Sequence, residues 1–383
     1  MTRKTLSCCI VVRNEEQRIV DCLEHITYLA DEIIIIDTGS KDRTCVFARS
    51  WATSKHAGDA VKVIEVGTRF HDSDGDFDFG AAKTYAFSLA SKDYVMWLDA
   101  YDRVQEQIIV KRKFIEVTAD KDVIITMPTA TSKKHAFSRL RIGPRLKSTI
   151  VGRVHEYMYM TDLTGLIRVH INIPILNEKP KRDLNRNIKL LIKEWDREAS
   201  SRIAFYIGNS YYGQRNYDDA IVWFRKRIYN FEWADEHAEE YYKALECIAD
   251  CTLKIFAVTH KSGHIINIDD VLDVTNEMIR RDPLRVEGYY YRGLYYIERK
   301  DYTTAMDNLR KFSTCKVPVN VKLWLDDDIY RGTSVSRAIE KCKTALKYSE
   351  VLVPEEISDY NSMSGTYMMG DSQYSRNPNQ TIF

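Results

Sequence analysis

Three short polar segments each follow a run of apolar, β-branched residues and contain side chains suited to binding and catalysis. They are Arg13-Asn14-Glu15, Asp37-Thr38-Gly39-Ser40 and Asp99-Ala100-Tyr101-Asp102. If the runs are parallel strands, these segments meet at the carboxyl edge of one sheet, where open α/β sheets bind ligands. Asp37 could accept hydrogen bonds from a nucleobase or ribose, and Asp99 with Asp102 could hold a divalent cation against a pyrophosphate. Asp37 and Ser40 could instead be only a turn and a helix cap.

The first half of the chain alternates between short β-branched runs and amphipathic segments. This alternation is typical of βαβ units, which form a mostly parallel sheet with helices on both faces. No Gly-x-Gly-x-x-Gly or P-loop motif follows a strand, so dinucleotide and P-loop sites are unsupported. We therefore expect an α/β domain. Its predicted strands are residues 6–12, 32–37, 61–66, 94–98, 123–127, 151–160 and 166–173, and its predicted helices are residues 15–29, 42–53 and 80–91.

A helical period begins at about residue 184 and contains an internal repeat. Residues 85 positions apart match, and the phrase Asn216-Tyr217-Asp218-Asp219-Ala220 returns as Asp301-Tyr302-Thr303-Thr304-Ala305. The pattern resembles the tetratricopeptide (TPR) helix–turn–helix, in which a small alanine allows two helices to pack closely. The sequence therefore predicts an α/β domain at residues 1–180, an all-α TPR-like domain at 181–350 and a flexible tail at 351–383.

The composition fits two globular domains and excludes several classes of protein. The 383 residues have a formal net charge of +1, which argues against a generally basic nucleic-acid binder or an acidic disordered chain. No apolar run approaches the ~18 residues of a membrane helix, and no secretory cleavage signal follows the basic start, so a cytoplasmic protein without a membrane span is expected. The eight cysteines include no Cys-x-x-Cys pair, so neither a zinc ribbon nor a redox pair is indicated.

Five motifs occur in an order and spacing that resemble glycosyltransferase family 2, in the subgroup that carries TPRs after its catalytic domain. They are Cys9-Ile10-Val11-Val12-Arg13-Asn14-Glu15-Glu16, Asp31-Glu32-Ile33-Ile34-Ile35-Ile36-Asp37-Thr38-Gly39-Ser40-Lys41-Asp42-Arg43-Thr44, Phe79-Gly80-Ala81-Ala82-Lys83, Trp97-Leu98-Asp99-Ala100 and Gly152-Arg153-Val154-His155-Glu156. The resemblance covers residues 6–349. It implies a Rossmann-like GT-A fold and transfer of a sugar, with inversion, from a nucleotide diphosphate sugar. A UDP-sugar is the expected donor.

The resemblance also implies roles for individual residues. Lys83 would contact the base or phosphate. Asp99 would face the ribose and the metal and would be, with Glu156, one of the two catalytic residues. Glu156 would face the acceptor as the catalytic base, with Asp162 as an alternative base. His155 would complete the metal site or contact the pyrophosphate. The uridine-like part of the donor would be held by Val12, Arg13, Asn14, Glu15 and Asp37.

One departure from the family pattern concerns the metal. Relatives usually have a second Asp where this chain has Tyr101, and a phenol is a poorer ligand for manganese or magnesium than a carboxylate. We expect Asp102 to take over and form the metal site with Asp99 and His155. Alternatively, Asp99 and His155 hold the metal weakly, or the site works without metal or is degenerate.

Residues 133–153 contain seven cations and no acid: Lys133, Lys134, Arg139, Arg141, Arg145, Lys147 and Arg153. Because relatives also carry arginines here, Arg141 and Arg145 are expected to bind the diphosphate of the donor. The same cations could bind the phosphates of DNA, whose modified base would be turned out of the duplex to receive the sugar. Since TPR arrays present a groove to peptides, a polypeptide acceptor is expected first. A non-catalytic TPR scaffold on a degenerate transferase fold is the alternative of another class.

Overall fold

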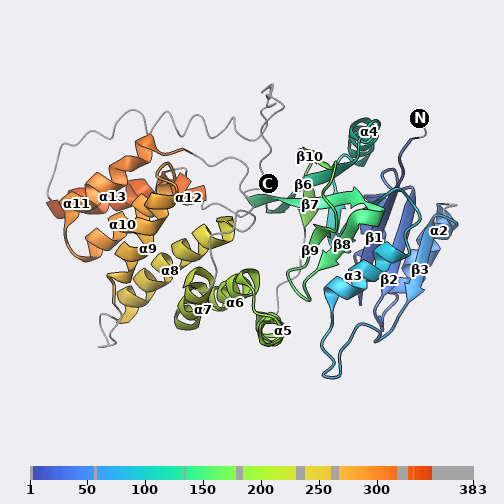
Figure 1. Cartoon of the computed structure of the whole chain (residues 1–383), viewed down its shortest axis with the longest axis horizontal. Coiled ribbons are helices and arrows are strands. Elements are labelled where there is room, and N and C mark those ends of the chain that lie inside the picture. Colours follow the sequence, from blue (N-terminus) through green and yellow to red (C-terminus); the bar gives the residue numbers. More distant parts are fainter. Residues whose placement is uncertain are drawn as a thin grey trace. The chain divides into compact units, whose positions relative to one another are not determined.

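A computed structural model divides the chain into two compact units, Met1–Asp183 and Leu184–Phe383 (Figure 1). The structure describes residues 3–55, 58–132, 135–177, 184–229, 238–259, 267–316, 327–330 and 332–346. The predicted tail at 351–383 lies outside these residues, as do Lys133 and Lys134 of the basic segment.

The first unit is built on a mixed sheet whose first four strands are parallel. β1 (Leu6–Val12) lies between β2 (Glu32–Asp37) and β4 (Tyr94–Asp99), and β3 (Val61–Glu65) pairs with β2. Nearly every residue of β1, β2 and β4 is buried, because helices cover both faces of the sheet. The α/β fold expected from the sequence is therefore confirmed.

The rest of the sheet contains antiparallel pairings that the sequence pattern does not reveal. β7 runs antiparallel to both β4 and β6, and β11 runs antiparallel to β5. The predicted strand at 151–160 is instead the end of β8 and the whole of β9, which form a separate hairpin around a turn at residues 152–156. The bounds are β5 (Asp102–Val104), β6 (Val123–Ser132), β7 (His135–Pro144), β8 (Ser148–Val151), β9 (Tyr157–Met160), β10 (Ile167–His170) and β11 (Ile175–Asn177).

Helices enclose the sheet through two separate apolar cores. α1 (Ile19–Glu24), α2 (Thr44–Ser54) and α4 (Gln107–Val117) supply Leu23, Trp51 and Phe114 to the core on one face. α3 (Phe79–Ser88) packs on the opposite face, with Phe87 beside Trp97 of β4 and residues of the β8–β9 hairpin. Each core joins β1 and β2 to its helices, which fixes the position of the loops at the strand ends.

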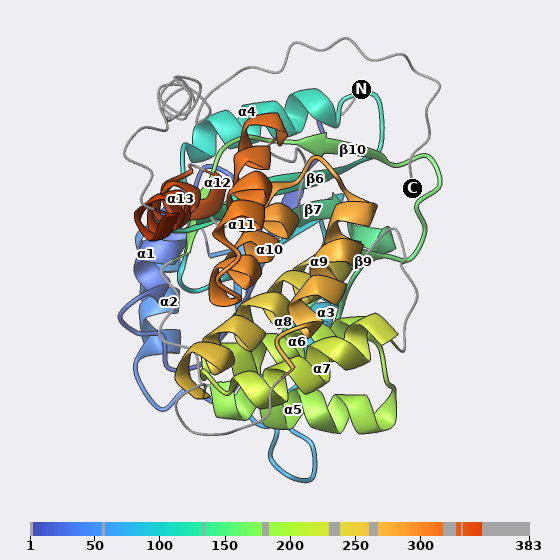
Figure 2. The ribbon, with the colours of Figure 1, turned by 90° about the vertical axis from the view of Figure 1, so that its left-hand side faces the viewer.

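The second unit consists of antiparallel helices that pack in sequence order (Figure 2). The two matching segments of the repeat form the helix pairs α6–α7 and α10–α11. A Cβ on Gly208 would lie 2.8 Å from the ring of Phe224, and one on Gly293 would lie 2.8 Å from Leu309, so both repeats need glycine at the same place. The bounds are α5 (Leu184–Arg197), α6 (Ser201–Gly213), α7 (Tyr217–Tyr229), α8 (Ala238–Thr259), α9 (Asp270–Arg281), α10 (Val286–Glu298), α11 (Tyr302–Leu309), η3 (Arg310–Thr314), α12 (Asp327–Tyr330) and α13 (Thr333–Leu346). Within the described residues, every helix is too short or too polar to cross a bilayer.

Candidate active site

The loops after β1 and β2 are hydrogen-bonded to each other at the carboxyl edge of the sheet. Val12 pairs in register with Asp37, so the two loops leave the sheet side by side. The backbone N–H of Asn14 donates to the Ser40 hydroxyl at 2.9 Å, and the Asn14 side chain accepts from the N–H of Lys41 at 2.8 Å. Arg13 and Asn14 are exposed, whereas the side chain of Val12 is buried and the Glu15 carboxylate accepts from Arg18 at 3.0 Å.

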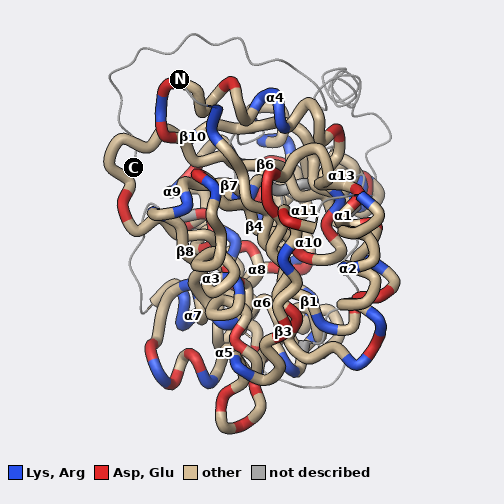
Figure 3. Tube along the Cα trace, turned by 90° about the vertical axis from the view of Figure 1, so that its right-hand side faces the viewer, with Lys and Arg blue, Asp and Glu red and all other residues tan. Residues whose placement is uncertain are grey.

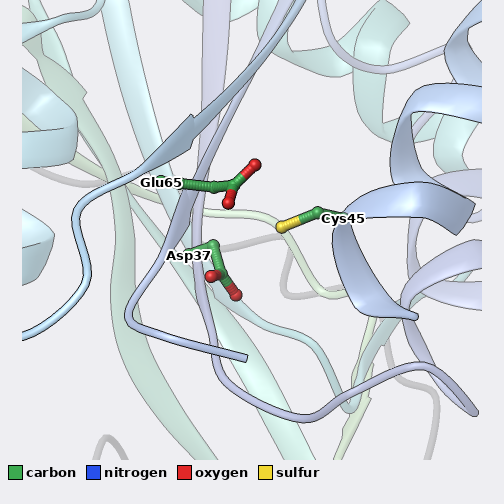
Figure 4. A group of neighbouring side chains, drawn as sticks. All are labelled: Asp37, Cys45 and Glu65. Atoms are coloured by element: carbon green, nitrogen blue, oxygen red, sulfur yellow. The ribbon is translucent and has the colours of Figure 1, made fainter. Parts of the chain in front are cut away.

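Asp37 is buried and organises the loop that follows β2. Its carboxylate accepts from the backbone N–H groups of Gly39 and Ser40 at 3.1 and 3.0 Å, and the Ser40 hydroxyl also donates to it. Cys45 at the start of α2 and Glu65 at the end of β3 extend toward this carboxylate (Figure 4). Burial, together with the charges of Asp37 and Glu65, raises the pKa of Cys45 to about 11, so its thiol is protonated at neutral pH. The nucleotide-binding role of Asp37 stays a prediction.

Lys83, Asp99 and Glu156 meet at the carboxyl end of β4. The Lys83 ammonium is 2.8 Å from Asp99 Oδ1 and 2.6 Å from Glu156 Oε1, and the side chain of Lys83 is only 3% exposed. α3 positions the lysine, and the Asp78 side chain caps this helix by accepting from the N–H of Ala81 at 2.8 Å. Glu156 arrives from the turn between β8 and β9, 73 residues further along the chain.

The charges of this group stabilise one another. Burial lowers the pKa of Lys83, but the carboxylates of Asp99 and Glu156 outweigh burial, and the pKa lies above its ordinary value. Burial raises the pKa of Glu156, but the Lys83 ammonium outweighs it and leaves this pKa below its ordinary value. Lys83 is therefore an ammonium ion and Glu156 a carboxylate at neutral pH.

Tyr101, which replaces the second acid of the family motif, belongs to the same group. Its hydroxyl hydrogen-bonds to the Asp99 carboxylate, and burial and the charge of Asp99 raise the pKa of Tyr101. The residue is therefore a neutral phenol at neutral pH. We call Lys83, Asp99, Tyr101 and Glu156 the Lys83 cluster.

Asp102 does not take the metal-binding role that the sequence suggested. Its side chain is fully buried and accepts from Arg141 Nη1 at 3.0 Å, from Asn177 at 2.6 Å and from the backbone N–H of Asp99 at 3.0 Å. Arg141, expected to bind the donor, is also fully buried, and its guanidinium lies 4.0 Å from the ring centroid of Trp97. Breaking a buried ion pair leaves an uncompensated charge in the interior, which is strongly unfavourable. Asp102 and Arg141 are therefore part of the core.

Arg145 lies at the opposite edge of the sheet from the candidate site. Because β7 is antiparallel to β4, its end at Pro144 pairs with Tyr94 at the start of β4. Arg145 begins the short helix η1 (Arg145–Lys147), and its Nε donates to the carbonyl of Lys92 at 2.9 Å. The length of β4, roughly 20 Å for a strand of this size, separates it from Asp99. The structure therefore corrects the expectation that Arg145 binds the donor.

Two acidic groups in the described residues bring three ligand atoms within 4.8 Å of one another, Asp37–Cys45–Glu65 and Asp72–Asp74–Asp76. The predicted set of Asp99, Asp102 and His155 does not form such a group. His155 lies in the turn at 152–156 with a φ of +56°, next to Gly152 with a φ of +94°. The role of His155 in binding metal or pyrophosphate stays a prediction.

The structure shows contacts of two motif residues, Trp97 and Arg153, that were not predicted from the sequence. The ring of Trp97 faces the Lys83 ammonium, with 4.3 Å from Nζ to the ring centroid, a cation–π contact on the side of β4 that α3 covers. Arg153 donates to Asp72 at 2.9 and 3.0 Å and so holds the loop before α3. The alternation of β4 could have placed Trp97 on this face, but no local pattern relates Arg153 to Asp72.

Comparison with known proteins defines the class of the first unit. Residues 7–143 match the family model described as glycosyl transferase family 2, in agreement with the mixed α/β sheet and the motifs at its carboxyl edge. Residues 7–143, which make up most of the first unit, therefore match glycosyltransferase family 2, and a TPR-like helical region follows them.

Two curated relatives resemble different parts of this organisation. A TPR repeat-containing protein of Synechococcus elongatus is 33% identical over 95 residues, which are 25% of this chain and 20% of that protein. The prophage-derived glycosyltransferase SunS of Bacillus subtilis is 20% identical over 322 residues, 80% of this chain and 70% of SunS. The chain thus spans a fifth of the first relative and about two thirds of the second.

The solved structures that resemble the chain are distant. The mannosyltransferase PcManGT of Pyrobaculum calidifontis, solved with GDP-Man and Mn²⁺, has a TM-score of 0.39 and 15% identity, over 81% of this chain and 88% of that one. Residues 1–349 of TarS from S. aureus have a TM-score of 0.35 and 11% identity, over 73% of this chain and 92% of that one.

Proposed function

We propose that this protein is an inverting glycosyltransferase that moves a sugar from a UDP-sugar to a polypeptide. The observation that carries the proposal is the meeting of Lys83, Asp99 and Glu156 at the carboxyl edge of a family 2 domain. In register, Asp99 and Asp37 pair with the adjacent residues Val11 and Val12 of β1, so the Lys83 cluster and the Asp37 loop share this edge. Ligands of open α/β sheets bind at such an edge.

Glu156 is the candidate base. In the proposed step, the nucleophilic atom of the acceptor attacks the anomeric carbon while its proton passes to the Glu156 carboxylate. The bond from that carbon to the diphosphate oxygen breaks, and its electron pair leaves on UDP, which inverts the configuration. The lowered pKa of Glu156 keeps the side chain ionised at neutral pH, so its carboxylate carries no proton when the acceptor arrives. No step of this proposal requires a divalent cation.

Calorimetric titration with UDP, GDP and their sugars tests the donor. Binding of UDP with a Kd at or below about 1 mM, and slow hydrolysis of one UDP-sugar by the protein alone, are expected. Absence of binding by every nucleotide, with or without manganese, would contradict the enzyme and favour the alternative of a non-catalytic TPR scaffold.

Substitution Glu156→Gln tests the base, because the amide oxygen can still accept from Lys83 but cannot take a proton. We expect kcat to fall roughly 10²–10⁴-fold while the Kd of UDP is unchanged. Asp162→Asn is the matched control, since Asp162 is exposed and paired with Lys147 at 2.9 Å. Loss of UDP affinity in Glu156→Gln would show a positioning role instead, and loss of turnover only in Asp162→Asn would identify Asp162 as the base.

A polypeptide acceptor is favoured over DNA by the partners of the basic segment. Arg141 and Arg153 are buried in ion pairs, Arg145 donates to the Lys92 carbonyl, and Lys147 pairs with Asp162. These four cations therefore already have partners within the fold, which weakens the case for phosphate binding. Retention on a DNA column should be weak even at low salt, whereas binding that falls steeply with salt would support the DNA acceptor.

A further inference from the structure

The carboxylates that a divalent cation would use at the end of β4 already form hydrogen bonds and ion pairs within the protein. Asp102 accepts from Arg141, from Asn177 and from the backbone, and none of its surface is exposed. Asp99 accepts from the Lys83 ammonium at 2.8 Å and from the Tyr101 hydroxyl. Binding a metal here would require breaking a buried ion pair or displacing an ammonium ion, and both are costly.

Lys83 lies where a cation would bridge two carboxylates. Its Nζ contacts Asp99 Oδ1 at 2.8 Å and Glu156 Oε1 at 2.6 Å, and it lies over the ring of Trp97. A hard divalent cation prefers several oxygen ligands, and an indole ring offers none. The surroundings of this position therefore fit an ammonium ion and do not fit manganese or magnesium.

Tyr101 decides the charge of the group. Lys83 contributes one positive charge, and Asp99 and Glu156 contribute two negative charges. A second aspartate at position 101 would add a third negative charge, which a divalent cation would have to offset before a diphosphate could approach. A neutral phenol instead donates a hydrogen bond to Asp99 and adds no charge.

We propose that the Lys83 ammonium takes the place of the divalent cation in this site, so that the protein binds a nucleotide diphosphate without metal. The identity of the ligand, a nucleotide diphosphate, rests on the proposed function. The absence of a metal site at the end of β4 is argued independently, from the contacts of Asp99 and Asp102. Lys83 is a positioning residue that holds Asp99 and Glu156. Tyr101 excludes the metal because it places a hydrogen-bond donor where relatives have a carboxylate ligand.

Binding of Mn²⁺ alone, followed by the electron spin resonance signal of the free ion, tests the proposal without a nucleotide. Wild type and Asp99→Asn should bind Mn²⁺ equally, because Asp99 is not a ligand. Any Mn²⁺ held by the Asp72 group is identified by Asp74→Asn. The double variant Lys83→Met/Tyr101→Asp removes the ammonium and exchanges the phenol for a third carboxylate. It should gain a Mn²⁺ site and melt at a higher temperature with Mn²⁺.

Titration of wild type with UDP is the second arm. Replacing excess EDTA by 1 mM Mn²⁺ should change the Kd of UDP by less than about twofold. A wild-type Mn²⁺ site that disappears in Asp99→Asn, or UDP binding that is lost in EDTA, would overturn the proposal. If UDP does not bind under either condition, the proposed donor is wrong, and the Mn²⁺ titration still decides whether a metal site exists.

Discussion

Lys83 is stable in the interior of the first unit because both carboxylates stay charged beside it. Removing one member of a buried ion pair leaves an uncompensated charge, at a cost of about 3–5 kcal/mol. We therefore expect Lys83→Met to lower the free energy of unfolding by that amount, measured by urea denaturation. Lys83→Arg should retain most of the stability. The triple variant Lys83→Met/Asp99→Asn/Glu156→Gln should recover part of the loss, and a triple variant as unstable as Lys83→Met would show that packing rather than charge is responsible.

Glu32, at the start of β2, links the stability of the fold to pH. Burial raises its pKa, but hydrogen bonds from Lys62, Ser7 and Ser91 outweigh burial and lower the pKa to about 2. The pKa is lower in the folded than in the unfolded chain, so this stabilisation is present above about pH 4.5 and is lost as the pH falls toward 2.

Substitution Glu32→Gln should therefore cost about 1–3 kcal/mol at pH 7 and flatten the dependence of stability on pH between about 4.5 and 2. Denaturant unfolding across this range is the measurement. Glu65→Gln, which removes an exposed pair with Arg49, should cost at most about 0.5 kcal/mol. An unchanged pH dependence in Glu32→Gln would assign the acid sensitivity to another group.

At the scale of the element, the first turn of α3 must lie close to the turn that carries Glu156. A Cβ on Gly80 would lie 2.5 Å from the carbonyl oxygen of Gly152, and that turn cannot retreat without moving Glu156 away from Lys83. We expect Gly80→Ala to lower stability by about 1–3 kcal/mol through overpacking and to weaken turnover more than UDP binding. Gly58→Ala is the control, because a Cβ there meets nothing within 4 Å. Equal effects of the two substitutions would contradict this explanation.

The helical unit repeats one packing solution in two elements. Gly208 faces Phe224 in the first repeat, Gly293 faces Leu309 in the second, and the buried alanines Ala220 and Ala305 occupy equivalent positions. Small residues at these places let paired helices approach closely, and this explains why the same small residues recur in both repeats.

At the scale of the whole molecule, each unit has cores of its own. Two apolar clusters lie entirely within Met1–Asp183 and a third lies entirely within Leu184–Phe383. Lys and Arg as well as Asp and Glu are scattered over the chain trace (Figure 3). We therefore expect a fragment of residues 1–183 to fold cooperatively and to bind UDP with the affinity of the full chain, measured by thermal melting and calorimetry. A fragment that aggregates or does not melt cooperatively would show that the first unit depends on the second.

The sequence by itself determined the features that depend on local periodicity and on short motifs. Apolar runs predicted β1, β2, β3 and β4, and the residues that follow β1, β2 and β4 were expected at one edge of a parallel sheet. The period of the second half predicted paired helices, because each repeat places its small and aromatic residues at the same offsets. The position of Asp99 at the end of a strand was predicted from the apolar run that precedes it.

Only the tertiary structure decided the partners of these residues. β7 runs antiparallel to β4, so Arg141 enters the core beside Asp102 and Arg145 lies at the far edge of the sheet. A glycine turn brings Glu156 to Lys83 across 73 residues. Such pairings depend on strand direction and burial, which act between distant segments and leave no periodic trace in the sequence. The same Asp and Arg side chains could bind a ligand or form a buried ion pair, and the folded chain decides which.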